Sequence, residues 1–416
     1  MEEEVIDSSF FSESLEEKKL IDLQKTGFEN SFNERQVGSI TMSIEPVSSR
    51  ASLDTVLKMF DEQPDLTAVP IEKDDAVIGV VERDFVTKNS SSGFKIFASK
   101  TCGDYVKECP YTLNCRDFIE KIATKVNETA IRVETKHFVV LINNRSFYGI
   151  MSVAKMNEKL EELRLHDLEK AAAIQQNMLK NNSDTKNFPF KVSFWNKMAN
   201  PVGGDYYIAR QICKGRYMIG SFDVSGKNVS AALLTVTLCS FFSMLTIQDC
   251  SKISANQIVA MLDNFLKEIV PVGNFITGAI CCVNPSTNTA SVFNCGHTNV
   301  LAYLKGESGK CRIATLEPTL PPFGMGAVAE TLTSGKKSTY IVPIKPGLQI
   351  NLYSDGFTDM QNDEGERYDD FHTKEFFVKL YNTDANSAES TIEKAVTDWI
   401  QHSLLPDDIT VMNIRF

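Results

Sequence analysis

Residues 203–223 read GGDYYIARQICKGRYMIGSFD, a stretch that predicts a β-hairpin and decides the fold around it. An alternating strand lies on each side of a tight turn at 213–215. Asp205 and Asp223 each lie nine residues from Lys214, so an antiparallel ladder places them opposite each other. Directly opposed side chains are about 4.5–5.5 Å apart at Cβ. Two carboxylates this close repel unless a proton or cation lies between them, and with no basic residue adjacent to either, a divalent metal is the economical interpretation.

A second pair of carboxylates repeats this arrangement further along the chain. The strand predicted over 348–354 ends at Asp355, and the doublet Asp407-Asp408 opens the strand predicted over 409–414. Carboxylates at strand ends suit hard, oxygen-liganded ions such as Mg²⁺ or Mn²⁺. Any one of these aspartates alone is explained as a turn former or a helix cap. Taken together, the four positions 205, 223, 355 and 407 indicate a metal site.

Five short motifs follow one another through the C-terminal half of the chain. They are Gly203-Gly204-Asp205-Tyr206-Tyr207, Asp223-Val224-Ser225-Gly226-Lys227, Asn294-Cys295-Gly296-His297, Leu352-Tyr353-Ser354-Asp355-Gly356-Phe357-Thr358-Asp359 and Asp407-Asp408-Ile409-Thr410. Over residues 186–416 the chain resembles the bacterial metal-dependent serine phosphatases of the stage II sporulation protein E type, which are relatives of the eukaryotic type-2C protein phosphatases. The resemblance implies an α/β (α+β) sandwich phosphatase domain, with two antiparallel sheets flanked by helices and a binuclear metal centre at one end.

The resemblance also implies roles for individual residues. Asp205 and Asp223 would be catalytic, and the metal ligands would be Asp205, Asp223, the Val224 carbonyl, Asp355 and Asp407. The ions would be two Mn²⁺ or Mg²⁺, which at a spacing of about 3.5–4 Å activate a water for in-line attack on phosphorus. The family's ligand is the first residue of the aspartate doublet, so Asp408 is not assigned as one. For Lys227 we favour a solvated side chain over a substrate contact, and for His297 a structural histidine over a general acid.

The implied activity is that of a hydrolase, a regulated protein-serine/threonine phosphatase. Its substrate would be a phosphorylated partner protein, with an anti-sigma-factor antagonist in a partner-switching signal-transduction circuit as the expected class. Two alternatives stay open. The chain could be a catalytically silent regulator that binds a phosphoprotein, or an adenine-nucleotide sensor with the phosphatase as its output.

Composition restricts the location and the partners of the protein. The formal net charge of −11 argues against nucleic acid or an anionic membrane as a partner. The chain begins Met1-Glu2-Glu3-Glu4 without a secretory leader, which favours a cytoplasmic location. Residues 229–247 carry no charge and are long enough to span a bilayer, but they directly follow the metal-binding turn. We therefore expect a core helix packed on the sheet.

The N-terminal half has a different character. Residues 1–36 are rich in acidic side chains and predict a mobile acidic arm or a helix that docks on a partner. Within 37–155, strands at 66–71 and 77–81 joined by a turn resemble a cystathionine-β-synthase (CBS) motif. A second copy is expected to comprise a helix over 115–126, strands over 130–133 and 138–143, and a strand around 147–151. The resemblance implies an α/β CBS-pair-like regulatory domain.

Such a pair implies adenine nucleotide as a possible ligand. The ribose-binding Ser/Thr-x-x-Asp pattern is not cleanly present after Gly79, however. A dimerisation module without a ligand is the alternative.

Residues 156–182 predict a linker helix between the two halves. Its apolar positions form one stripe that changes register near Asp167. The stripe is explained either by a helix packed on its own domain or by a dimeric coiled coil that transmits a signal. A homodimer through this helix or through the N-terminal domain is thus a possible assembly.

Overall fold

The computed structural model describes residues 32–90, 101–142, 146–181, 183–226, 229–247, 252–305, 311–335 and 337–416. The chain divides into two compact units, residues 1–166 and residues 167–416. Most of the acidic arm expected over residues 1–36 lies outside the described residues, and so does Lys227. At the start of the described chain, the Arg35 guanidinium forms an ion pair with Glu120, 2.5 Å away.

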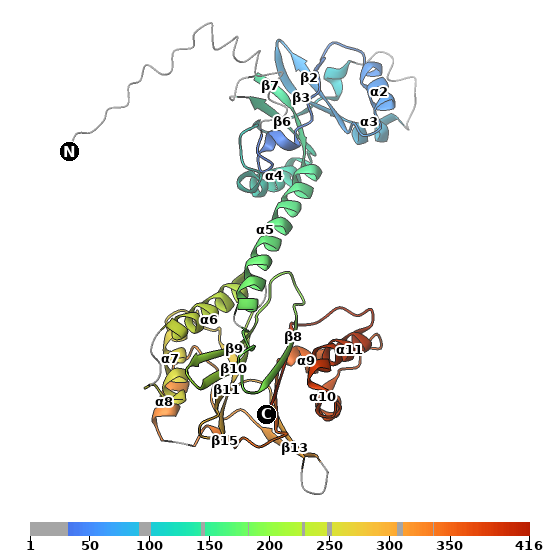
Figure 1. Ribbon diagram of the computed structural model, residues 1–416. Coiled ribbons are helices and arrows are strands. Elements are labelled where there is room, and N and C mark those ends of the chain that lie inside the picture. Colours follow the sequence, from blue (N-terminus) through green and yellow to red (C-terminus); the bar gives the residue numbers. More distant parts are fainter. Residues whose placement is uncertain are drawn as a thin grey trace, which may run out of the picture. The chain divides into compact units, whose positions relative to one another are not determined.

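The first unit contains two small sheets built on one repeated plan (Figure 1). Each sheet begins with a short strand parallel to the next one, and an antiparallel hairpin with one bulge follows. Gly79 and Gly149 occupy equivalent places in the two hairpins, and at each of them a Cβ would collide with a backbone carbonyl of a neighbouring segment. The strands are β1 (Val47–Ser48), β2 (Ala68–Lys73), β3 (Ala76–Glu82) and β4 (Lys107–Glu108) in one sheet, and β5 (Leu113–Asn114), β6 (His137–Ile142) and β7 (Ser146–Ser152) in the other.

Helices cover these sheets, and one of them includes residues that were predicted to form a strand. They are η3 (Val37–Ile40), α2 (Leu53–Glu62), α3 (Arg83–Ser90), η5 (Cys102–Tyr105) and α4 (Ile119–Val133). Residues 130–133, expected as a strand, form the last turn of α4. The β-branched Ile131 and Val133 suggested a strand, but the helical spacing of buried Ile119, Ala123 and Val126 continues through this turn. Ile131 consequently faces solvent, with 81% of its surface exposed.

Helix α5 (Val153–Asn181) covers residues 156–181 of the linker predicted over 156–182, and it begins three residues earlier than expected. Its first turns bury Met156, Leu160 and Leu163 in the core of the first unit. Its last turns bury Leu179 in the main core of the second unit. The two packed ends explain the change of register in the apolar stripe, because each end presents a different face to its own unit.

The second unit contains the two antiparallel sheets that the sequence predicted, each with five strands. One has the order β15-β12-β11-β10-β9 and the other β14-β13-β16-β17-β8. One apolar core includes residues of both sheets, among them Ile219 and Phe293 from the first and Ile350 and Met412 from the second. The strands are β8 (Lys191–Lys197), β9 (Asp205–Cys213), β10 (Arg216–Val224), β11 (Ile276–Asn284), β12 (Thr289–Cys295), β13 (Val300–Lys305), β14 (Cys311–Leu316), β15 (Tyr340–Pro343), β16 (Gln349–Tyr353) and β17 (Ile409–Arg415).

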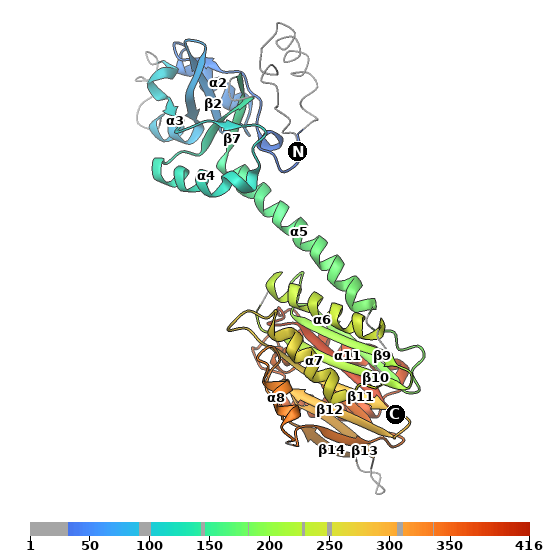
Figure 2. The ribbon, with the colours of Figure 1, turned by 90° about the vertical axis from the view of Figure 1, so that its left-hand side faces the viewer.

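Helices flank the sandwich on both outer faces. In Figure 2, α6 and α7 lie over the sheet that contains β9 to β12, and buried Phe242 and Leu262 join these helices to the main core. On the other side α10 and α11 pack with Phe377 and Ile392 on a second core. The helices are α6 (Val229–Ile247), α7 (Ala255–Lys267), α8 (Ala327–Thr333), α9 (Asp355–Asp359), α10 (Asp369–Tyr381), η6 (Ala385–Ser387) and α11 (Ala388–Ile400).

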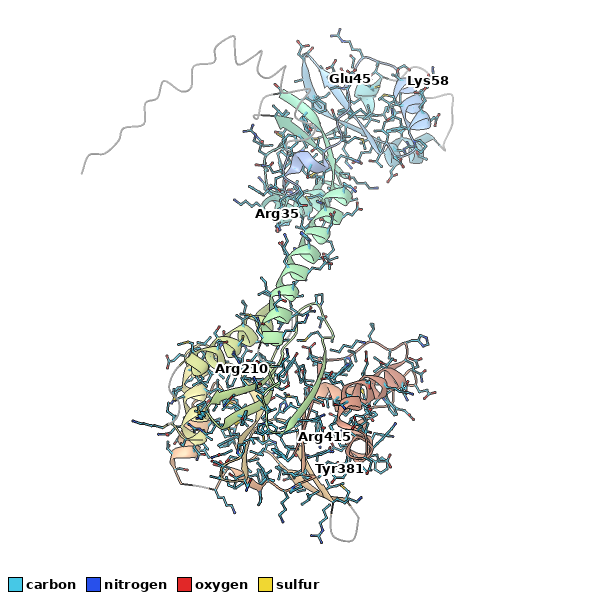
Figure 3. The ribbon with its side chains drawn as sticks, in the orientation of Figure 1. Arg35, Glu45, Lys58, Arg210, Tyr381 and Arg415 are labelled. Atoms are coloured by element: carbon cyan, nitrogen blue, oxygen red, sulfur yellow. The ribbon has the colours of Figure 1, made fainter. Side chains whose placement is uncertain are left out.

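The uncharged segment 229–247 is the helix α6, as expected, with Leu238, Phe242 and Leu245 buried in the core. In the described parts of the chain, none of the helices combines the length and the apolarity needed to cross a membrane. The opposite helical layer is fastened by Arg415 at the end of β17. Its guanidinium donates to the carbonyls of Leu380 and Thr383, at the C-terminal end of α10 (Figure 3).

Candidate functional site

The two aspartates that define the hairpin are paired as predicted. In the ladder between β9 and β10, Asp205 lies opposite Asp223, and a bulge after Arg216 accommodates the turn. Asp205 is 1% exposed, whereas Asp223 is partly exposed. The hairpin therefore carries one buried and one accessible carboxylate on neighbouring strands.

Asp205 is held in a buried polar setting. Its Oδ2 accepts a hydrogen bond of 2.6 Å from the Thr410 hydroxyl on β17. Burial raises the pKa of Asp205 well above its ordinary value, and the nearby charges of Asp223 and Asp408 raise it further. Hydrogen bonds from Thr410 and Ser354 act in the opposite direction. A positive charge close to Asp205 would relieve this cost.

One cavity of about 500 Å³ collects the other predicted site residues at one end of the sandwich. Asp223, Val224, Asp355 and Asp407 all line it, but Asp205 does not. The remaining lining residues are Asn200, Val202, Gly203, Gly204, Ser225, Gly226, Phe275, Thr277, Gly296, His297, Thr298 and Asp408. All five motifs contribute lining residues, the first through Gly203 and Gly204, which precede Asp205. Motifs that are far apart in the sequence therefore come together at one place.

The two residues of the doublet Asp407-Asp408 have different surroundings. The Asp408 carboxylate accepts hydrogen bonds of 2.7 Å from the N–H groups of both Ala199 and Gly204, and a longer one from Asp205. Burial raises the pKa of Asp408, and these hydrogen bonds partly offset the increase. Asp408 thus fixes the loop that leads into β9, which agrees with its exclusion from the expected ligand set.

Glycines let two loops approach this doublet. A Cβ on Gly356 would lie 2.0 Å from the Asp408 carbonyl oxygen, and a Cβ on Gly203 would lie 2.2 Å from Asp408 Oδ2. Any larger residue would push the Asp355 loop or the Asp205 loop away from the cavity. Glycine is therefore required at both positions, because the space next to Asp408 does not admit a side chain.

Asp355 follows β16 and begins the short helix α9. Burial raises its pKa, and the charges of Asp407 and Asp359 add to the effect. Asp355 follows β16 and Asp407 precedes β17, two neighbouring strands of one sheet, whereas Asp223 lies on β10 of the other sheet. The cavity therefore collects carboxylates whose mutual repulsion is not balanced by a lysine or arginine among its described lining residues.

The donor set fits a hard divalent cation, since it consists of carboxylate and carbonyl oxygens. Burial raises the pKa of Asp205, Asp355 and Asp408, and neighbouring carboxylates raise it further, so a cation at the site would favour their ionised forms. Within the described ranges, no three Asp, Glu, His or Cys side chains stand close enough together to enclose an ion. Side chains such as Asp223 and Asp407 would have to turn toward an ion for the expected ligands to meet.

His297 lines the cavity and is held through its backbone and one ring nitrogen. Its backbone N–H donates to Asn294 Oδ1, and its Nδ1 lies 3.0 Å from the Thr277 hydroxyl. Burial lowers its pKa to about 4, although the backbone of Tyr353 partly opposes the shift, so the imidazole is neutral near pH 7. Its Nε2 is buried without a hydrogen-bond partner among the described residues, so the structural histidine that we expected is satisfied at one ring nitrogen and not at the other.

Gln175 on α5 is a contributor that the sequence analysis did not identify. This buried amide donates to the Gly203 carbonyl (2.7 Å) and to the Thr235 hydroxyl (2.8 Å), and its Oε1 accepts from the Gly203 N–H (3.1 Å). The last turns of α5 thereby grip the loop that precedes Asp205. The feature of the sequence that could have identified Gln175 is its position as a polar residue within the apolar stripe of the helix.

Comparisons with known proteins agree with this geometry. Residues 214–416, a little under half of the chain, match the profile of the Stage II sporulation protein E (SpoIIE) family. A comparison with curated protein sequences gives no significant match. The PP2C domain of SiaA from Pseudomonas aeruginosa is similar in structure, with a TM-score of 0.52 and 18% identity over 62% of this chain and 98% of that chain.

A second solved structure gives a weaker similarity. The PP2C phosphatase domain and a regulatory fragment of SpoIIE from Bacillus subtilis match with a TM-score of 0.42 and 15% identity, over 56% of this chain and 64% of that chain. The family profile falls on residues of the unit that holds the carboxylate cavity. The second unit therefore has the mixed α/β fold of PP2C domains, and over residues 214–416 it is similar in sequence to the SpoIIE family.

Proposed function

We propose that this protein is a metal-dependent phosphatase that removes phosphate from phosphoserine or phosphothreonine on a partner protein. The observation that carries the proposal is the convergence of Asp223, Asp355 and Asp407 on one cavity, with Asp205 paired beside it. The SpoIIE family profile over the same residues supports this class of reaction.

Each residue then has a stated task. Asp223, Asp355, Asp407 and the Val224 carbonyl would hold two Mn²⁺ or Mg²⁺ ions, and Asp205 would orient them directly or through water. When bound, such ions withdraw charge from phosphate oxygens and lower the pKa of water. Asp408 keeps the loop before β9 in place through its backbone hydrogen bonds. Hydrolysis joins the water oxygen to phosphorus, breaks the bond to the serine oxygen and leaves that oxygen protonated.

The assay is phosphate release from p-nitrophenyl phosphate and from a phosphoserine peptide by the full chain. Turnover with Mn²⁺ or Mg²⁺ that stops on addition of a chelator would support the proposal. If phosphoserine peptides bind but are not hydrolysed with either metal, the silent phosphoprotein-binding alternative is correct instead.

Regulation by the first unit is the second part of the proposal. Helix α5 belongs to the core of the first unit at one end and grips the Gly203 loop at the other. A signal that alters α5 would thus reach the residues next to Asp205. The sequence resemblance suggests a phosphorylated anti-sigma-factor antagonist as substrate and a homodimer through α5 or the first unit. A cross-linking or sedimentation experiment on the full chain tests the dimer.

Adenine nucleotide is a possible signal for the first unit, but the charged side chains of that unit give it little support. Its cavity of about 500 Å³ presents the carboxylates of Glu82 and Asp84, and Lys136, which also lines it, is already paired with Asp84. Glu82 is engaged by His137 at 2.9 Å. Titration with AMP and ATP decides the question, since a change in turnover on nucleotide binding would establish the sensor. Absence of binding would assign the first unit to protein contacts.

A further inference from the structure

An apolar surface borders the carboxylate cavity and has no part in the chemistry described above. It consists of the exposed side chains Ile269, Val272, Phe275 and Met325, called here the apolar rim. Val272 is fully exposed and Met325 is 54% exposed. Single exposed apolar residues are common on protein surfaces, but grouped ones mark interaction sites. The four residues form one surface if the loops that carry them are held together.

Backbone contacts join the two loops that carry the rim. Residues 268–275 connect α7 to β11, and residues 323–326 precede α8. Ile276 and Phe323 exchange backbone hydrogen bonds of 2.8 and 3.2 Å, so the ends of the loops are paired. A Cβ on Gly324 would lie 3.1 Å from Val270, which shows how closely the loops pack. The rim is thus continuous across both loops.

A buried carboxylate fixes the second loop. Asp263 on α7 is 0% exposed, and it accepts hydrogen bonds from the N–H groups of Gly324 (3.1 Å) and Ala329 (3.0 Å). The first loop contains a turn closed by a hydrogen bond from Asn274 N–H to the Pro271 carbonyl, 3.0 Å long. These bonds hold Met325 and Val272 outward on ordered backbone.

Phe275 connects the rim to the catalytic cavity. It lines that cavity together with Asp223 and Val224. Its N–H donates to the Ser225 hydroxyl (2.8 Å), and the Ser225 N–H donates back to the Phe275 carbonyl (3.0 Å). A phosphoryl group that enters the cavity therefore brings its flanking atoms toward Phe275.

The chemistry of the two loops restricts what binds there. The exposed side chains of the rim itself are all apolar, whereas the cavity beside them is acidic. Lys267 and Glu268, at the end of α7, border the rim, and the Lys267 side chain lies against Gly326. Apolar side chains next to a phosphoserine would find Val272, Phe275 and Met325.

We infer that the apolar rim is a specificity surface, which selects protein substrates whose phosphoserine is flanked by apolar side chains. The inference rests on the proposed phosphatase function, because it uses the cavity as the place where the phosphate binds. It ranks phosphoserine peptides with apolar flanks above those with uncharged polar flanks and above small phosphoesters.

The test compares two phosphoserine peptides, one flanked by leucines and one by asparagines, with p-nitrophenyl phosphate as the small substrate. For the unaltered full chain with Mn²⁺, we expect a KM about tenfold lower for the leucine peptide, as partial burial of such side chains provides. Val272→Ser combined with Met325→Ser should remove this difference and change turnover of p-nitrophenyl phosphate by less than about twofold. Both positions are exposed, and serine adds no charge that would repel phosphate.

The matched control is Ile341→Ser on β15, which is 60% exposed and does not line the cavity. It should leave the peptide preference intact. Equal KM values for the two peptides in the unaltered protein would overturn the inference, and so would a double variant that impairs both peptides and p-nitrophenyl phosphate alike. A dimer that dissociates in the double variant while the peptide preference persists would show instead that the rim binds a second copy.

A further arm separates this inference from the phosphatase function itself. If no phosphoester is hydrolysed with any metal, the proposed function fails while the rim is still measurable. Fluorescence anisotropy with peptides that carry a non-hydrolysable phosphonate in place of phosphoserine then reports binding alone. Tighter binding of the leucine peptide, lost in the double variant, supports the rim, whereas equal binding overturns it.

Discussion

Adjacent aspartates in this protein have different chemical surroundings, and the difference decides what each one does. The Asp408 carboxylate accepts from the N–H groups of Ala199, Gly204 and Asp205, whereas Asp407 lines the cavity and accepts from the N–H of Asp408. Charge-assisted hydrogen bonds of the first kind fix backbone. The family resemblance distinguishes the two residues by their position, and the hydrogen bonds of Asp408 give a physical difference between them.

Replacing each aspartate of the doublet by asparagine should therefore give opposite results. Asp408→Asn should lower the free energy of unfolding by about 1.5–3 kcal/mol, because it removes a charged acceptor from buried donors. Asp407→Asn should change the stability of the metal-free protein by less than about 0.5 kcal/mol. It should nevertheless reduce metal-dependent turnover at least about a hundredfold, the size of effect expected when a ligand group is lost.

Urea denaturation and p-nitrophenyl phosphate assays on both variants check this prediction. Each variant serves as the control for the other, since they differ by one position in the chain. A stable and active Asp407→Asn protein would remove this residue from the metal site.

At the scale of elements, helix α5 connects the core of the first unit with the loop before Asp205. Its C-terminal turns place Gln175 against the Gly203 loop, and the three hydrogen bonds of this amide are all buried. The sequence predicted the helix and its apolar stripe, but it did not predict that Gln175, a polar residue within the stripe, would bind the Gly203 loop. Side-chain hydrogen bonds to distant backbone depend on tertiary packing, which periodicity does not encode.

Gln175→Ala should loosen this loop and with it Asp205. We expect the free energy of unfolding of the second unit to fall by about 1–3 kcal/mol, because the Gly203 carbonyl and N–H lose their buried partners. Turnover should also fall, since Asp205 would no longer be held in place. Circular dichroism melts and metal-dependent assays measure the two effects.

Gln176→Ala is the matched control, because the neighbouring side chain is exposed on the same helix. It should behave like the unaltered protein in both measurements. If the two variants are indistinguishable, α5 does not position the loop in the way described.

The elements show where sequence patterns are sufficient and where they are not. The β9–β10 hairpin could be predicted with its register because the turn lies midway between Asp205 and Asp223. The apolar run 229–247 could be placed as a core helix because it follows a polar turn directly. The strand expected over 130–133 was wrong, because β-branched residues at the end of α4 imitate a strand although the helical period continues.

For the molecule as a whole, the balance of charge at the cavity should couple metal binding to stability. Asp205, Asp355 and Asp408 have raised pKa values in the metal-free protein. A carboxyl whose pKa is raised by folding stabilises the protein fully only below its unfolded pKa, and this stability is lost as the pH rises through the raised value. A divalent cation replaces the protons and reverses the loss.

Mn²⁺ should therefore raise the melting temperature of the second unit, and the increase should be larger at pH 8 than at pH 5. At a hundredfold excess over the dissociation constant, the expected increase is about 5–10 °C for a unit of this size. Thermal melts at both pH values, with and without Mn²⁺, measure it. An increase that is equal at the two pH values would contradict coupling to these carboxyls.

The cavity itself combines what a sequence can and cannot show. Asp223, Asp355 and Asp407 could be identified because each stands at a strand end in a short motif, and strand ends in such a sandwich meet. The apolar rim could not be identified, since Val272 and Met325 lie in separate loops without a shared pattern. The backbone pairing of Ile276 with Phe323 and the close packing of Gly324 against Val270 bring those loops together.

The most direct test of the central claim is phosphate release from a phosphoserine peptide by Asp223→Asn, with Asp370→Asn as the control. Asp223 is the carboxylate shared between the hairpin and the cavity, whereas Asp370 is an exposed aspartate of α10. With Mn²⁺ present, Asp223→Asn should lose at least about a thousandfold in turnover and keep its circular dichroism spectrum, and Asp370→Asn should match the unaltered protein. Near-normal, Mn²⁺-dependent turnover by Asp223→Asn would contradict the assignment of this cavity as the metal-dependent phosphatase site.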